Sequence, residues 1–289
     1  MNTVLYFELR RKRRNLLKYA VLPAAVSLVL FVVCMAVDAF FPYFNRTYMK
    51  WPDMVKDLFS LKPWSGDLWL NIWQLFALVY PFYLIYVMMT EMAEALSEEE
   101  RLETVVYLHN AGVDRKTVFW SKMLVWTGGT FVCCGTLLAL HIVFAAALRQ
   151  PQGMKNAFYY FAILFFICLL YLSIALFMAS CRARQGITAD RVMAVLILPW
   201  LVSRIPAFMR FISELLVLTG REGSLSEQLG DMGQRLEVAS ILSPLTWSYP
   251  AISIERSYFI SGIIVSVVLT GTAFSIYMHK RMTPMGGQN

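Results

Sequence analysis

Residues 157–180 read AFYYFAILFFICLLYLSIALFMAS, a stretch that contains no charged side chain. A transmembrane helix needs about 20 consecutive apolar residues to cross roughly 30 Å of hydrocarbon, so this stretch predicts a membrane span. The whole chain agrees, because 58% of its 289 residues are hydrophobic and 16% are charged, whereas an ordinary soluble domain is about 25% charged. The sequence therefore predicts an all-α, polytopic membrane protein and excludes a soluble domain.

Five further stretches have the length and apolar character of a span. Together the predicted spans are residues 18–41, 69–90, 119–148, 157–180, 191–217 and 257–278. The first span follows a basic run, as a signal sequence does, but it is longer than the roughly 7–15 apolar residues of a signal sequence, so we expect a retained anchor. Residues 1–289 then form one transmembrane domain, with a cytoplasmic segment at 91–122 and an extracellular segment at 218–256.

The basic residues give the predicted orientation. Fifteen Lys and Arg residues fall on the side of the N-terminal tail, the 91–122 segment and the C-terminal tail, and nine fall on the other side. Cytoplasmic loops carry the excess of Lys and Arg, so both termini are predicted to be cytoplasmic in a multi-pass protein of the cell membrane. The net charge of +7 follows from these flanking residues, and we expect no nucleic-acid partner.

The cytoplasmic segment 91–122 is rich in glutamate and contains helix signals. Ser97 followed by Glu100 matches a capping box, which marks a helix start, and apolar residues then recur at helical spacing. Gly112 is placed to end this helix in a left-handed conformation, and Asp114 is placed to cap the next helix. Such a short amphipathic helix suits docking of a cytoplasmic protein or a position on the lipid surface. Its acidity favours a protein, because the inner leaflet is itself negative.

Residues 97–124, SEEERLETVVYLHNAGVDRKTVFWSKML, resemble the coupling loop of type-2 ABC exporter permeases. In that family an acidic run precedes a Glu-Thr element, a Leu pair, a Pro-Ser-Arg-like turn and a Lys that opens the third helix. These elements match Glu103-Thr104, Tyr107-Leu108, Val113-Asp114-Arg115 and Lys122. The stretch LSPLTW at 242–247 is similar to the Ser-Pro element that many of these permeases carry before the last helix.

The resemblance implies six transmembrane helices and a transport function. The family's loop forms a coupling helix that docks into a separate ABC ATPase subunit, so the implied docking residues are Ser97, Glu98, Glu100, Glu103, Thr104, Leu108, Gly112, Asp114 and Arg115. ATP and Mg²⁺ are then bound by the partner ATPase, and this chain holds no cofactor. The resemblance also implies a second permease copy, as a homodimer or a heterodimer, and export of a hydrophobic, peptide-like or lipid-like substrate. Closure of the ATPase subunits on ATP would push helix 97–112 and rotate the first, second and fifth spans.

Ionisable residues within a span are costly and are functional candidates by default. At 1.5 Å per residue, Arg204 lies about 20 Å above the cytoplasmic face, and Arg210 and Glu214 are spaced to pair on one helical face. They are candidates for an outward pathway or gate, and the alternative is that the arginines reach the lipid headgroups. The remaining pathway candidates, for which hydrogen bonds between helices are the alternative, are Asn71, Gln74 and His141.

The extracellular segment divides into two parts of different composition. The stretch 220–233 is polar and contains several glycines, which predicts a loop. The stretch 236–254 is apolar but is interrupted by Pro244 and Pro250, which predicts short re-entrant or interfacial helices rather than a span.

Common catalytic motifs are missing from the sequence, so we expect no enzyme. It contains no G-x-x-x-x-G-K-[ST] loop and no G-x-S-x-G or H-E-x-x-H motif, and its five cysteines show no disulfide or metal spacing. His109 and Asp114 match the H-x-x-x-x-D pair of glycerolipid acyltransferases, in which His is a general base, and this gives a remote enzymatic alternative. The other alternative is a membrane protein without transport activity, either a sensor or an assembly factor.

Overall fold

The computed structural model describes residues 2–36, 50, 52–59, 68–101, 108, 110, 112–182, 189–220, 223–249 and 256–279. All regular structure in this part of the chain is helical, as the composition predicts. The α-helices are α1 (Asn2–Ala36), α3 (Asp53–Leu58), α4 (Leu68–Arg101), α6 (Arg115–Ala147), α7 (Pro151–Arg182), α8 (Ala189–Leu218), α9 (Ser224–Arg235) and α10 (Arg256–His279), and the 3-10 helices are η1 (Glu237–Ile241) and η2 (Pro244–Ser248).

Five helices in the described residues are long and apolar enough to cross a membrane. The qualifying stretches are Ile72–Leu96, Arg115–Ala147, Pro151–Cys181, Ala189–Leu218 and Tyr258–His279. Each coincides with a predicted span, which confirms a multi-pass helical architecture. The predicted first span, 18–41, falls on α1 as far as Ala36. Residues 37–41 lie outside the described residues, and the sixth crossing stays a prediction.

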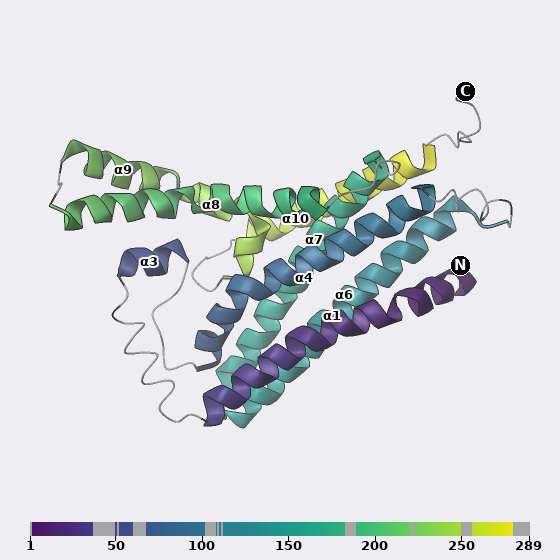
Figure 1. Ribbon diagram of the computed structural model, residues 1–289, viewed down its shortest axis with the longest axis horizontal. Helices are drawn as coiled ribbons and strands as arrows, with labels where there is room; N and C mark the ends of the chain where they lie inside the picture. Colours follow the sequence, from purple (N-terminus) through teal and green to yellow (C-terminus); the bar gives the residue numbers. More distant parts are fainter. Residues whose placement is uncertain are drawn as a thin grey trace.

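Helix α7 lies at the centre of the bundle. It packs against α4, α6 and α10, and α1 packs against α6 (Figure 1). Leu164, Ile167 and Cys168 of α7 are almost completely buried. A helix that is apolar on every side is one that other helices or lipid surround, which explains why the stretch 157–180 contains no charge.

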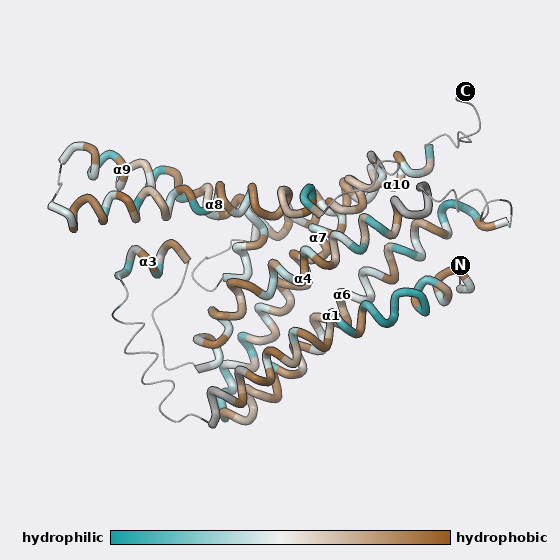
Figure 2. The backbone as a smooth tube through the Cα atoms, viewed as in Figure 1, coloured by the Kyte–Doolittle hydropathy of each residue, from teal (hydrophilic) through white to brown (hydrophobic). Residues whose placement is uncertain are grey.

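One end of the bundle collects hydrophilic residues together with the start of α1 and the end of α10. Figure 1 shows the start of α1, the end of α4, the start of α6 and the end of α10 at this end. Figure 2 shows hydrophilic residues along the first half of α1 and hydrophobic residues along the middle of the bundle. We call this region, made of residues 2–19, 91–101, 108, 110 and 112–122, the charged end of the bundle.

The predicted loop at 220–233 is wrong, because most of it forms α9, which packs back along α8 (Figure 1). A Cβ at Gly233 would lie 2.9 Å from the carbonyl oxygen of Pro206 in α8, so α9 approaches α8 as closely as a glycine allows. The hydroxyl of Ser213 in α8 also donates a hydrogen bond of 2.6 Å to the carbonyl oxygen of Ser226 in α9. Small residues here serve helix packing rather than a loop.

The apolar stretch after α9 folds into the 3-10 helices η1 and η2. Trp247 of η2 donates from Nε1 to the carbonyl oxygen of Ile241 at 3.0 Å, and Trp73 of α4 donates from Nε1 to the carbonyl oxygen of Ser248 at 3.1 Å. These bonds fix η2 against the bundle. Entry of this segment into the bilayer stays a prediction, and residues 250–255 lie outside the described residues.

Replacing Gly233 with Leu should detach α9 from α8, because overpacking against a backbone costs about 1–3 kcal/mol. The expected result is faster hydrogen exchange of the α9 amides, with the amides of α4 and α7 unchanged. Gly223→Leu is the matched control, because a Cβ at Gly223 meets nothing within 4 Å. Unchanged exchange in the Gly233→Leu variant would contradict close packing of the two helices.

Candidate functional site at the charged end of the bundle

The turn that connects α4 to α6 has the two caps that the sequence predicts. Gly112 adopts the left-handed conformation, with φ of +77°, and the amide of Val113 donates to the carbonyl oxygen of Leu108 at 2.9 Å. This is the hydrogen bond of a Schellman helix end. Asp114 is extended and its carboxylate accepts from the amide of Lys116 at 3.4 Å, as a helix N-cap does. The turn is therefore held by defined backbone geometry.

The predicted start of a new helix at Ser97 is wrong, because α4 continues without a break from Leu68 to Arg101. Buried side chains, including Met92 and Leu96, hold the preceding turns of α4 in the bundle, and a helix already formed is extended more easily than a new one is nucleated. The capping-box signal is therefore overridden by the helix that precedes it.

The other predicted docking residues are described to different extents. Glu98 and Glu100 belong to the last turn of α4. Leu108 is half-buried and its neighbour Asn110 is exposed. Glu103, Thr104 and the His109 of the acyltransferase alternative lie outside the described residues.

Arg115 is engaged within the chain. Its guanidinium Nη1 donates to the carbonyl oxygen of Tyr277 in α10 at 3.2 Å, and its Cζ lies 5.9 Å from the centre of the Tyr277 ring. A cation at this range over an aromatic face is attracted by the ring. Arg115 thus joins the start of α6 to the end of α10.

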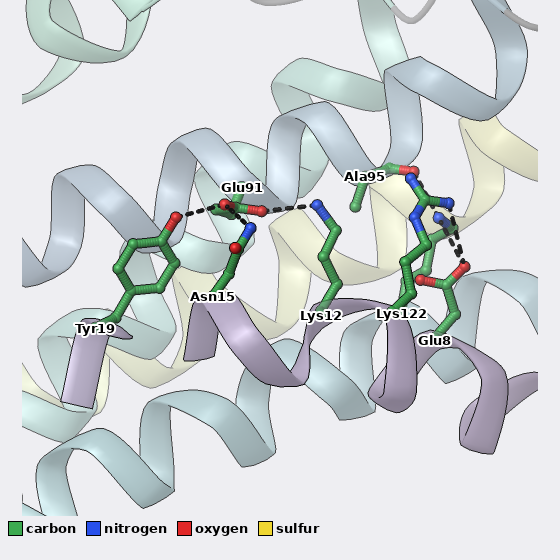
Figure 3. Close-up of polar contacts among 8 residues, drawn as sticks. Glu8, Lys12, Asn15, Tyr19, Glu91, Ala95 and Lys122 are labelled. Carbon is green, nitrogen blue, oxygen red and sulfur yellow. Dashed lines mark hydrogen bonds and ion pairs between the residues drawn. The ribbon is translucent and has the colours of Figure 1, made fainter. Parts of the chain in front are cut away.

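A buried carboxylate, Glu91 of α4, is surrounded by donors from α1 (Figure 3). Lys12 donates from Nζ to Oε2 at 2.8 Å, and Asn15 and Tyr19 both donate to Oε1, at 3.0 and 2.5 Å. Glu91 is 8% exposed and Lys12 is 9% exposed, so the pair is shielded from solvent. A buried carboxylate is tolerated when it is paired and fully hydrogen-bonded, and this one is both.

A second pair lies next to the first and involves the third helix, α6. Lys122 of α6 is 1% exposed, and its Nζ donates to the carbonyl oxygen of Ala95 in α4 at 2.6 Å. The same nitrogen lies 3.6 Å from Oε1 of Glu8 in α1. The two pairs together join α1, α4 and α6, as Figure 3 shows, with one carboxylate for each lysine.

This network is not among the features predicted from the sequence, although a signal for it is present. Glu8, Lys12, Asn15 and Tyr19 follow each other at steps of four, three and four residues, which places them on one face of a helix. The charge of the basic run in the N-terminal tail predicts only orientation and does not reveal this shared face. Glu91 and Lys122 were likewise assigned to the cytoplasmic segment by composition, and they lie inside the bundle.

The predicted pathway residue Arg204 is buried within the fold, with 7% of its surface exposed. Its Nη1 donates to the carbonyl oxygen of Leu58 in α3 at 3.3 Å. Its Cζ lies 5.1 Å from the ring centre of Tyr249 and 5.8 Å from that of Trp200. Arg204 therefore holds α3 and the end of η2 against α8, which differs from the alternative of a side chain extended to the headgroups.

The predicted pair between Arg210 and Glu214 is wrong. Arg210 lies 3.8 Å from Oε1 of Glu237, because η1 folds back along α8 after α9 and brings this carboxylate beside it. Glu214 is exposed.

His141 of α6 is buried in a cage of aromatic rings. Its ring centre lies 5.0 to 5.8 Å from five other ring centres, those of Phe31, Trp69, Trp73, Phe76 and Phe161. Ring contacts with three other helices thus take the place of the interhelical hydrogen bond predicted as its alternative. Gln74 is also buried, and the side chain of Asn71 lies outside what the structure describes. None of the five rings around His141 is one of the two rings that lie beside Arg204.

The fold and the charged end define the class of the protein as a multi-pass helical membrane protein. Comparisons with models of protein families, with curated proteins and with solved structures give no match. The function is therefore inferred from the residues described above.

Removing one member of the Lys12–Glu91 pair should destabilise the protein by about 3–5 kcal/mol, because the other charge stays buried without its counter-charge. Removing both is expected to be much less costly. We expect Lys12→Met and Glu91→Met each to lower the free energy of unfolding in detergent, and the double variant to recover most of the loss. Arg13→Met, at an exposed position of the same helix, is the control. Additive losses in the double variant would show that the two side chains do not interact.

Proposed function

We propose that this chain is the transmembrane permease subunit of an ABC exporter, which couples ATP hydrolysis in a separate ATPase subunit to export of a hydrophobic substrate. The observation that carries the proposal is the doubly capped turn at Gly112 and Asp114, which lies at the charged end of the bundle. A turn with fixed backbone geometry transmits displacement to the helices on either side of it, whereas a flexible loop absorbs displacement.

The helices beside this turn extend through the bundle. α4 has 34 residues and α6 has 33, so each is about 50 Å long at 1.5 Å per residue. The buried pairs of Lys12 with Glu91 and of Lys122 with Glu8 join α1 to both helices. A push on the turn by an ATPase would therefore move α1, α4 and α6 together.

In this mechanism the helices that move differ from the first, second and fifth spans, whose rotation the family resemblance implies. α1 and α4 carry the first and second of these predicted spans, and α6 joins them through Lys122. α8, the fifth, packs mainly against α9 and η1. In the proposed mechanism, α8 is the element against which the other three helices move.

The proposal includes partners and a location. ATP and Mg²⁺ are bound by the partner ATPase, and a second permease copy completes the assembly. The charged end faces the cytoplasm of a cell-membrane protein with six crossings, which places both termini there.

Substitution at the turn should separate the ATPase from the permease without unfolding it. For Glu103→Ala/Leu108→Asp, we expect the amount of ABC ATPase that co-purifies to fall about tenfold, since the loss of an apolar anchor at a docking surface costs roughly 1.4 kcal/mol or more. Leu225→Asp is the matched control, because Leu225 is an exposed leucine on α9, away from the charged end. Export and ATPase co-purification at wild-type levels in the turn variant would refute the docking role.

A further inference from the structure

A cavity of about 460 Å³ lies among α4, α6, α7 and α10, and neither the residues of the two charged pairs nor Arg204 is among its lining residues. Its inner wall includes Met92, Trp126 and Leu176, each 1% exposed. Trp120 and Val267, which also line it, are 41% and 67% exposed. The cavity therefore reaches from the surface of the bundle to its core, and its volume is in the range of small-molecule sites.

The cavity opens between helices that qualify as membrane spans. α10 packs along α7 and makes few contacts with α6. Phe274 of α10 meets Phe119 and Trp120 of α6, with ring centres 5.3 and 5.9 Å apart, and Trp120 and Phe274 line the cavity. Lipid acyl chains, rather than water, surround this part of a membrane protein, so a ligand reaches the cavity from within the bilayer.

None of the described residues that line the cavity is charged, and three of its four hydroxyl residues form one cluster. Ser173 of α7 lies 2.6 Å from Ser266 of α10, Oγ to Oγ, and Thr270 of α10 donates to Ser173 Oγ at 3.2 Å. Ser173 itself donates to the carbonyl oxygen of Leu169 at 2.9 Å, so Ser266 is the donor in its bond to Ser173.

This arrangement uses every hydroxyl hydrogen of the cluster. Each hydroxyl has one hydrogen to donate and two lone pairs to accept with. Ser266 and Thr270 therefore keep acceptor capacity and have no hydrogen left for a ligand. A carboxylate or a phosphate needs donors and finds none in this cluster, whereas a hydroxyl or an amide N–H finds an acceptor.

We propose that this cavity is a membrane-embedded binding site for an uncharged lipid whose polar group carries a hydrogen-bond donor. The ligand enters between α6 and α10, places its acyl chain against the inner wall and donates to Thr270 or Ser266. That this lipid is the exported cargo rests on the function proposed above, whereas binding of the lipid to the cavity does not. Binding is therefore measured on the purified chain, without ATP and without an ATPase.

The first test blocks the cavity. The purified chain in phosphatidylcholine nanodiscs is titrated with tritiated 1,2-dioleoylglycerol, for which we expect saturable binding. A Cβ at Gly271, which lines the cavity, meets nothing within 4 Å, so Gly271→Leu fills the space without striking a neighbour and should weaken binding about tenfold or more. Gly135→Leu is the control, since Gly135 also has open space around it and does not line the cavity. Absence of saturable binding, or equal binding by the two variants, would overturn the site.

The second test examines recognition of the donor. We expect 1,2-dioleoyl-3-acetylglycerol, which lacks the hydroxyl, to compete about threefold to tenfold less well than dioleoylglycerol, the effect of one hydrogen bond within a membrane. Ser266→Ala/Thr270→Val, which removes both acceptors, should abolish this preference. Thr272→Val should keep it, because the Thr272 hydroxyl is exposed and bonded to Val268 of its own helix. Equal competition in the wild-type protein, or a preference that survives the double substitution of Ser266 and Thr270, would refute recognition by the hydroxyl cluster.

Discussion

Two ion pairs buried among three helices, Lys12 with Glu91 and Lys122 with Glu8, fix how the charged end of the bundle is built. Apolar faces do little to fix how one membrane helix is aligned along another, because lipid tails are as apolar as the side chains that face them. A buried charge has to stay beside its counter-charge. α1 is therefore held in one register against α4 and α6. The Gly112–Asp114 turn lies between these same two helices, so its position depends on the same contacts.

Most of the fold could be predicted from the sequence, because long apolar stretches leave few alternatives to a membrane helix. Five of the predicted spans coincide with helices of the structure, and Gly112 and Asp114 cap the predicted turn. The errors arose where a local signal competed with tertiary packing. Ser97 carries a cap signal inside a continuing helix. Gly233 lies in a stretch with the composition of a loop, yet its backbone lies close against α8.

The candidate site was less predictable, because it depends on which helices meet. Glu91 and Lys122 stand 31 positions apart, and nothing local distinguishes them from solvated loop charges. Their partners are both on α1 and meet them because α1 packs beside α4 and α6. The hydroxyl cluster is equally hard to predict from the sequence, since Ser173 and Thr270 are 97 positions apart. Serine and threonine are common in membrane helices, and packing of α10 against α7 brings these ones together.

Docking of an ATPase at the charged end is tested most directly by photo-crosslinking in the native membrane. Asn110 is exposed beside the turn, and Leu225 is exposed on α9. With a benzophenone amino acid at either position, an ABC ATPase should be crosslinked and identified by mass spectrometry from position 110 and not from position 225. Crosslinks from position 110 to lipid alone, or an ATPase captured from position 225, would contradict the proposed function.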